Sequence, residues 1–229
     1  MQTTRSWTRK IAFVLGEQSL RQILTIMSSV SEDIGYILEC SDRSTITCSS
    51  LDEVLGFQNS KRRRIRGLIL HTPYDQPTYV QVRFREDVSL DPIECTVRGN
   101  DETVLILSSR LDDSISSLTQ WYGVLAFYST AWLLLLTTGL LLLGLIGIGA
   151  FGHPDHATNE RIEGLRLGGV ILATVFLTFG VTWVQNALFP RSVFLIGDGR
   201  SRYNRIVFFR RSLILPFLIG LIVWRVTTR

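Results

Sequence analysis

The segment TYVQVRFR at residues 78–85 alternates polar and apolar side chains without a break. Its apolar members are Val80, Val82 and Phe84, and the residues between them are polar, aromatic or charged. A repeat of two places alternate side chains on opposite faces of an extended chain. Strands covered on both faces are apolar throughout, so this pattern predicts a strand of an antiparallel sheet with one buried face.

Similar segments lie on both sides of this strand. The sequence predicts further strands at residues 9–15, 34–40, 44–49, 65–72 and 93–98, and helices at 17–29, 51–57 and 102–118. Ser50 and Glu53 fit a capping box, in which each side chain binds a backbone N–H at the start of a helix. Together these elements predict an α+β N-terminal domain with a mostly antiparallel sheet over residues 1–120.

Two long apolar stretches follow, at residues 121–151 and 165–189. A helix needs ~20 apolar residues to cross a membrane. We therefore expect a two-helix transmembrane hairpin over residues 121–189. The basic segment 190–229 contains a third apolar stretch at 212–224, predicted to be a short membrane-associated helix. It either forms a short third crossing that leaves residues 225–229 outside, or lies in or re-enters the inner interface.

The charges suggest an orientation for this arrangement. Residues 190–229 carry eight Arg against the single Asp198, whereas the loop at 152–164 has one Arg and three acidic residues. Positive segments favour the cytoplasmic side of a membrane. We expect a multi-pass protein of the cell inner (plasma) membrane with a cytosolic N-terminal domain, and anionic lipids of the inner leaflet as partners.

Small residues recur in the two apolar stretches. They permit close helix packing, either between copies in a homo-oligomer or within the hairpin of one chain. The candidate packing positions are Gly139, Gly144, Gly147, Gly149, Gly164, Gly168, Gly169 and Ala173.

Two basic segments are candidate sites for a ligand or an anionic lipid. The first contains Lys61, Arg62, Arg63, Arg64 and Arg66, and the second contains Gly197, Gly199, Arg200 and Arg202. Backbone N–H groups of a glycine-rich turn can bind phosphate, and arginines add charge. Neither segment has a Walker or G-x-G-x-x-G pattern. For the second segment, a tight turn with arginines at lipid headgroups is the simpler interpretation. For the first, a solvated or membrane-facing edge is simpler, and nucleic acid is disfavoured because aromatic residues are not interleaved.

Residues typical of catalysis are sparse. His153 and His156 have metal-ligand spacing, but Pro154 blocks the regular helix that would align them. The three cysteines form no C-x-x-C pair and are expected to be ordinary buried thiols. His71 lies on an apolar predicted strand. We expect no metal site and no cofactor, and the balance is against an enzyme.

These observations lead to one main functional hypothesis and two alternatives. The main hypothesis is an integral membrane protein whose cytosolic domain binds a partner or small ligand and acts on a self-associating transmembrane module, as a sensor, scaffold or membrane effector. One alternative is an oligomeric pore lined by uncharged, glycine-rich helices. The other is a membrane-anchored, nucleotide-dependent enzyme using the two basic segments.

Overall fold

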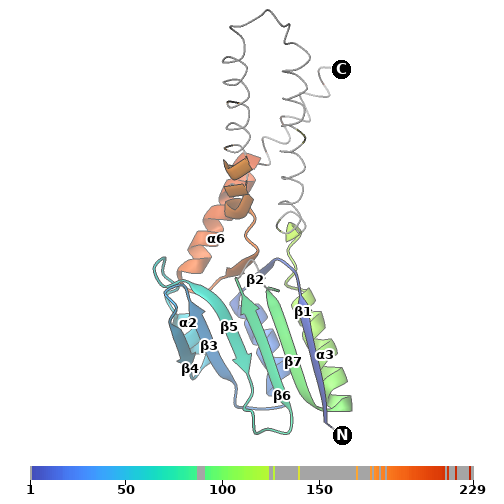
Figure 1. Ribbon diagram of the computed structural model, residues 1–229. Helices are drawn as coiled ribbons and strands as arrows, with labels where there is room; N and C mark the ends of the chain where they lie inside the picture. The colour runs from blue at the N-terminus through green and yellow to red at the C-terminus, as the bar shows by residue number, and fades with distance from the viewer. Residues whose placement is uncertain are drawn as a thin grey trace, which may run out of the picture. The chain divides into compact units, whose positions relative to one another are not determined.

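The computed structural model describes residues 2–86, 91–123 and 185–214 without interruption. It also describes isolated positions at 126, 139, 169, 176, 178–180, 182–183, 216, 220 and 227. Met1–Gly123 and Pro190–Arg229 form one compact unit, and Val124–Phe189 forms another. The fold below is that of the first unit (Figure 1).

A six-stranded antiparallel sheet is the centre of this unit, with the order β1-β7-β6-β5-β3-β4. Its strands are β1 (Gln2–Arg9), β3 (Gly35–Cys40), β4 (Thr45–Cys48), β5 (Ile65–His71), β6 (Tyr79–Arg85) and β7 (Ile93–Asn100). In β6, Val80, Val82 and Phe84 are fully buried and the intervening residues are partly exposed. The alternation read from the sequence is therefore confirmed.

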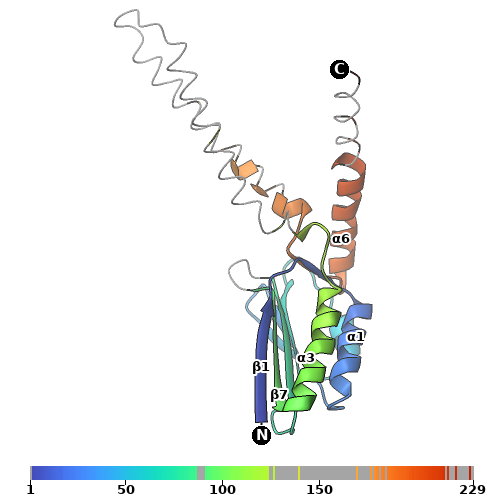
Figure 2. The same ribbon diagram turned by 90° about the vertical axis from the view of Figure 1, so that its right-hand side faces the viewer.

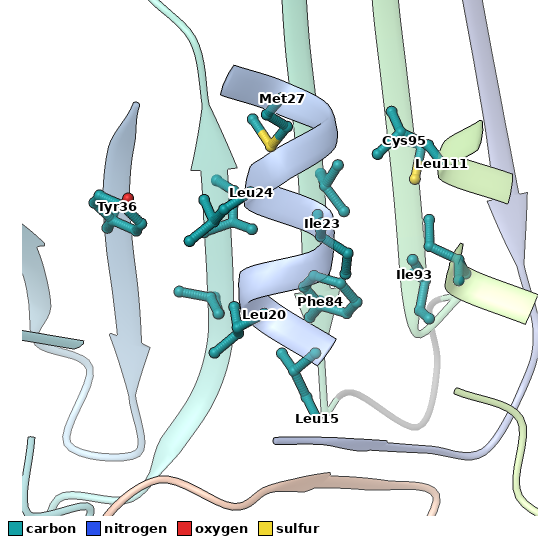
Figure 3. Close-up of a cluster of buried hydrophobic side chains, with 14 of the residues drawn as sticks. Leu15, Leu20, Ile23, Leu24, Met27, Tyr36, Phe84, Ile93, Cys95 and Leu111 are labelled. Atoms are coloured by element: carbon teal, nitrogen blue, oxygen red, sulfur yellow. The ribbon is translucent and has the colours of Figure 1, made fainter. Parts of the chain in front are cut away.

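Two helices cover the same face of the sheet, as Figure 2 shows: α1 (Glu17–Ser28) and α3 (Asp101–Ser116). Their apolar residues recur at helical spacing and are buried; in α1 these are Leu20, Ile23, Leu24 and Met27. Figure 3 shows Leu20 and Ile23 beside Phe84 of the sheet, and Ile93 between α1 and α3. Burying one such side chain contributes about 1.5–3 kcal/mol, so this layer is the main source of stability. The short helix α2 (Leu51–Gly56) begins at Ser50, whose hydroxyl accepts from the Glu53 N–H at 3.3 Å.

The C-terminal segment returns to the N-terminal domain. Strand β2 (Phe13–Leu15) pairs in parallel with β8 (Ser192–Phe194), so residues about 180 positions apart lie side by side. The Phe13 ring meets Phe194 edge-on at 5.8 Å and Phe84 at 5.5 Å, which joins this small sheet to the main core. Helix α6 (Asp198–Phe209) follows β8 and continues into a π-helical turn, η1 (Arg210–Ile214).

The predicted elements of the N-terminal domain are confirmed, with one difference. Residues 9–15 were expected to be one strand, but the chain forms the edge strand β1 before them and the separate β2 at their end. β1 escapes prediction because its sequence, QTTRSWTR, has a single apolar residue, Trp7, and so shows no alternation. The antiparallel α+β assignment holds.

None of the helices that the structure describes is long and apolar enough to cross a membrane. On this evidence the predicted transmembrane hairpin is wrong. The longest of them, α3, has 16 residues and several charged side chains. At ~1.5 Å per residue it is about 24 Å long, short of a ~30 Å hydrocarbon core. Most of residues 121–189, and most of the predicted third helix at 212–224, lie outside the described residues.

This correction extends to the predictions that depend on the hairpin. The multi-pass inner-membrane location and the main hypothesis of a membrane sensor, scaffold or effector have no described spanning helix to support them. The same is true of the pore and of the membrane-anchored enzyme. We therefore withdraw all of these functions.

Candidate functional site

Asn59 is the centre of the contact between the N-terminal domain and the C-terminal segment. It lies in the loop between α2 and β5 and is 2% exposed. Its side-chain amide donates to the carbonyls of Ile196 at 3.0 Å and Phe194 at 3.4 Å. Its Oδ1 accepts from the Ile65 N–H at 3.0 Å and from Arg202 Nη2 at 2.9 Å. Asn59 has a φ of 46°, a left-handed conformation that Asn tolerates better than most residues.

The glycine turn before α6 packs closely against this loop. A Cβ on Gly199 would lie 2.0 Å from the Phe194 carbonyl oxygen and 2.7 Å from Asn59 Nδ2. Gly197 has a φ of 51°, and a Cβ there would lie 2.4 Å from the Phe57 carbonyl oxygen. The Asp198 N–H donates to the Gln58 carbonyl at 2.9 Å. These two glycines are therefore needed for close packing of backbone on backbone.

A cavity of about 120 Å³ lies beside this contact. It is lined by residues from β5, from β8 and from the first turns of α6, together with the segment that follows β6. They are Asn59, Arg64, Ile65, Glu86, Pro190, Ser192, Val193, Phe194, Gly199, Arg202, Tyr203 and Ile206. We call this space the Arg64–Arg202 cavity.

Ser192 is the unusual residue of this cavity. It is 4% exposed, and its hydroxyl has no hydrogen-bond partner in the described part of the chain. A buried hydroxyl without a partner costs about 1–3 kcal/mol of stability. Buried polar groups are usually satisfied, so this exception requires an explanation.

The charges at the cavity are predominantly positive. The Arg202 guanidinium donates through Nη2 to the backbone carbonyl of Asn59 at 2.8 Å as well as to its side chain. Arg64 forms an ion pair with Glu86, the one acidic residue of the lining. Burial, and then the charges of Arg202 and Arg66, lower the pKa of Arg64. The cavity therefore combines two guanidiniums with one carboxylate.

The structure brings part of the two predicted basic segments together. Arg64 from the first segment and Gly199 and Arg202 from the second line the Arg64–Arg202 cavity. Gly197 and Arg200 instead line a wider, more open cavity of about 780 Å³ at the start of α1. Lys61, Arg62, Arg63 and Arg66 are exposed and line neither cavity. Arg63 pairs with Asp42 at 3.4 Å.

Sequence reasoning missed three members of the site, Asn59, Ser192 and Glu86. Ser192 and Glu86 carry no signal of their own, because each acquires its role from residues distant in the chain. Of the predicted helix-packing positions, Gly139 and Gly169 are described, and no described atom lies within 4 Å of a Cβ built on either. The other six lie outside the described residues.

The cysteines and the metal-ligating residues of the described ranges form no second candidate site. The three cysteines are free and buried, as expected, and burial raises the pKa of the Cys95 thiol to about 12. Cys95 therefore stays protonated and is a poor nucleophile. No cluster of three metal-ligating side chains occurs among the residues that the structure describes. His153 and His156 lie outside them.

Comparison with known proteins assigns no family to this chain. No family model matches it, and neither a curated protein nor a solved structure is significantly similar to it. Its function must therefore be argued from the site.

Proposed function

We propose that this protein binds a small ligand through a phosphate or similar oxyanion group, held in the Arg64–Arg202 cavity. The proposal joins the two basic segments that the sequence separates by more than 130 residues. A volume of about 120 Å³ is well below the ~300–1,000 Å³ of pockets that enclose a whole organic ligand. The cavity is therefore suited to a single charged group, with the rest of the ligand outside.

The arginines supply the attraction. A guanidinium forms charge-assisted hydrogen bonds with phosphate oxygens, often two at a time. Arg202 uses Nη2 for Asn59, a neutral residue, so its charge is not compensated by a carboxylate there. Asn59 also fixes the position of this side chain, which lowers the entropy lost on binding.

The observation that carries the proposal is the Ser192 hydroxyl. Ser192 lines the cavity, and its hydroxyl oxygen is almost completely buried and lacks a partner among the described residues. After rotation of the Ser192 side chain towards the cavity, a phosphate oxygen there would accept a hydrogen bond from this hydroxyl. Ligand binding would then remove the cost of the unsatisfied group.

The first experiment is a titration of the full chain with inorganic phosphate, followed by denaturant unfolding at constant ionic strength. Phosphate at 100-fold above its Kd should stabilise the protein by about 2.7 kcal/mol, and chloride should not. Arg202→Gln should weaken phosphate binding at least tenfold, because a charge-assisted hydrogen bond is worth about 1.5–3 kcal/mol. Arg200→Gln is the matched control, because it removes the same charge from the same helix but outside this cavity. Equal losses in both variants, or no stabilisation by phosphate, would refute the proposal.

Glu86 provides a second arm of the experiment. Its carboxylate pairs with Arg64 and would compete with an anion for this arginine. Glu86→Gln should therefore tighten phosphate binding by up to about 5-fold, because a partly exposed ion pair contributes about 0.2–1 kcal/mol. An unchanged or weaker affinity would mean that the anion does not occupy the space between Arg64 and Arg202.

A further inference from the structure

We infer that β1 is a surface through which two copies of this chain associate, edge to edge, into one continuous antiparallel sheet. This inference is independent of the proposed ligand site. β1 pairs with β7 on one side only and forms an edge of the six-stranded sheet (Figure 1). The outward backbone N–H and C=O groups of its eight residues have no partner in the part of the chain that is described.

The β1 edge lacks most of the usual protections against pairing, and its two charged residues, Arg5 and Arg9, are both bound to α3. Natural edge strands are commonly short, interrupted by proline or a bulge, or covered. β1 contains no proline, and its register with β7 is continuous over all eight residues. The opposite edge, β4, has only four residues. Of the two edges, β1 alone offers a long, regular template for another strand.

The two faces of β1 restrict how a second copy can pair. Arg5 and Arg9 point to the helical face, where they bind Ser108 and Asp112 of α3. Ser6 points to the other face, where its hydroxyl lies 3.1 Å from that of Thr96. Residues directly opposite in a sheet share a face. In an antiparallel pair of two β1 strands related by a two-fold axis, odd-numbered residues of one copy must therefore lie opposite odd-numbered residues of the other. Even-numbered residues must likewise lie opposite even-numbered residues.

Two central registers satisfy this condition. One places Arg5 opposite Arg5, and like charges directly opposite are destabilising. The other places Ser6 opposite Ser6 and Arg5 opposite Trp7 of the other copy, a pairing that favours a cation–π contact. In this second register Thr4 also lies opposite Thr8. The Ser6-centred register avoids the direct Arg5–Arg5 contact and is therefore favoured.

An exposed apolar residue lies next to this edge. Leu105 shares a helical stripe with Ser108 and Asp112, the α3 residues that contact β1. Leu105 is 55% exposed and its neighbour Ile106 is 48% exposed, so both apolar residues lie on the part of α3 that the sheet does not cover. A second copy joined at β1 brings its own α3 to the same side of the sheet, where Leu105 would lose solvent contact.

The test is the mass of the purified full chain, measured by sedimentation equilibrium from about 1 to 100 µM. We expect a dimer of the 25.9 kDa chain within this range. Thr4→Lys/Thr8→Lys places ammonium groups opposite each other in the Ser6-centred register and should give a monomer. Thr4→Glu/Thr8→Lys differs only at position 4, places opposite charges together and should remain a dimer. A wild-type monomer at every concentration, or a dimer that survives the double lysine variant, would overturn the inference.

Cross-linking checks the register separately. With Ser6→Cys, two thiols face each other across the two-fold axis, so mild oxidation should link the copies covalently. With Thr8→Cys, the thiols lie four residues apart along the strands, about 13 Å, and should not link. The native cysteines are buried and should not contribute. Linking of Thr8→Cys but not Ser6→Cys would contradict the proposed register.

Discussion

Arg202 and Asn59 are 143 positions apart in the chain, yet the guanidinium of Arg202 donates to both the backbone carbonyl and the side-chain oxygen of Asn59, at 2.8 and 2.9 Å. Asn59 in turn binds the chain at Phe194, Ile196 and Ile65. One buried amide therefore connects the loop after α2, strand β5, strand β8 and helix α6. Asn59 and Arg202 both line the proposed ligand cavity, so this connection forms part of its wall.

Removal of the Asn59 side chain should destabilise the protein strongly. Asn59→Ala leaves buried backbone groups without partners. It also puts alanine, which has a Cβ but cannot form the hydrogen bonds of the asparagine side chain, in a left-handed conformation. We expect the free energy of unfolding in urea to fall by about 2–4 kcal/mol. Asn59→Gly should lose the same hydrogen bonds but recover about 1 kcal/mol of backbone strain. If alanine and glycine cost the same, the left-handed φ is not a source of strain.

The glycine turn provides a second test of this contact. Gly199→Ala introduces a Cβ about 2.0 Å from a backbone oxygen, which cannot move without displacing β8. We expect a loss of more than about 2 kcal/mol in unfolding free energy. Gly56→Ala is the control, because no described atom lies within 4 Å of a Cβ there. It should be neutral or mildly stabilising, and a comparable loss in both variants would argue against the packing of residues 197–199 on residues 57–59.

The fold of the N-terminal domain could be predicted from the sequence wherever the burial of one face makes apolar residues recur at a regular spacing. β6 buries one face and α1 buries one stripe, so each reveals itself in the spacing of its apolar residues. β1 lies at an edge, where little of it is buried, and its position depends on pairing with β7, about 90 residues away. Its sequence therefore lacks the alternation that marks β6.

The candidate site was only partly readable for a similar reason. The arginines and glycines were identified by residue type, and Arg64, Gly199 and Arg202 do meet at one cavity. Their meeting depends on the parallel pairing of β2 with β8, two strands of three residues each, which no local pattern predicts. The apolar stretches led the interpretation towards a membrane protein, because composition alone does not reveal where the C-terminal segment packs.

Acid should weaken the attachment of β1 to α3 through Asp112. Arg9 donates to the Asp112 carboxylate, with Nε at 2.8 Å from Oδ1, and this hydrogen bond lowers the pKa of Asp112. Because the pKa is lower in the folded state, the contribution is present above about pH 4 and is lost as pH falls through the folded-state value. Urea unfolding of Asp112→Asn should show a lower stability at pH 7 and a smaller further loss in acid. Asp113→Asn, which leaves the Arg9 contact in place, should lose stability in acid as the wild type does.

Ser192→Ala should separate stability from binding. The hydroxyl is buried without a partner among the described residues, so its removal should raise the unfolding free energy of the ligand-free protein by about 1 kcal/mol. If phosphate occupies the Arg64–Arg202 cavity, the same change should weaken phosphate binding about 3–10-fold, because one hydrogen bond to the anion is lost. Urea unfolding with and without phosphate measures both quantities. Most core substitutions lower stability. A gain in stability together with a loss of phosphate affinity would therefore indicate that the Ser192 hydroxyl serves to bind the ligand. A loss of stability would instead show that the hydroxyl already has a partner in the free protein.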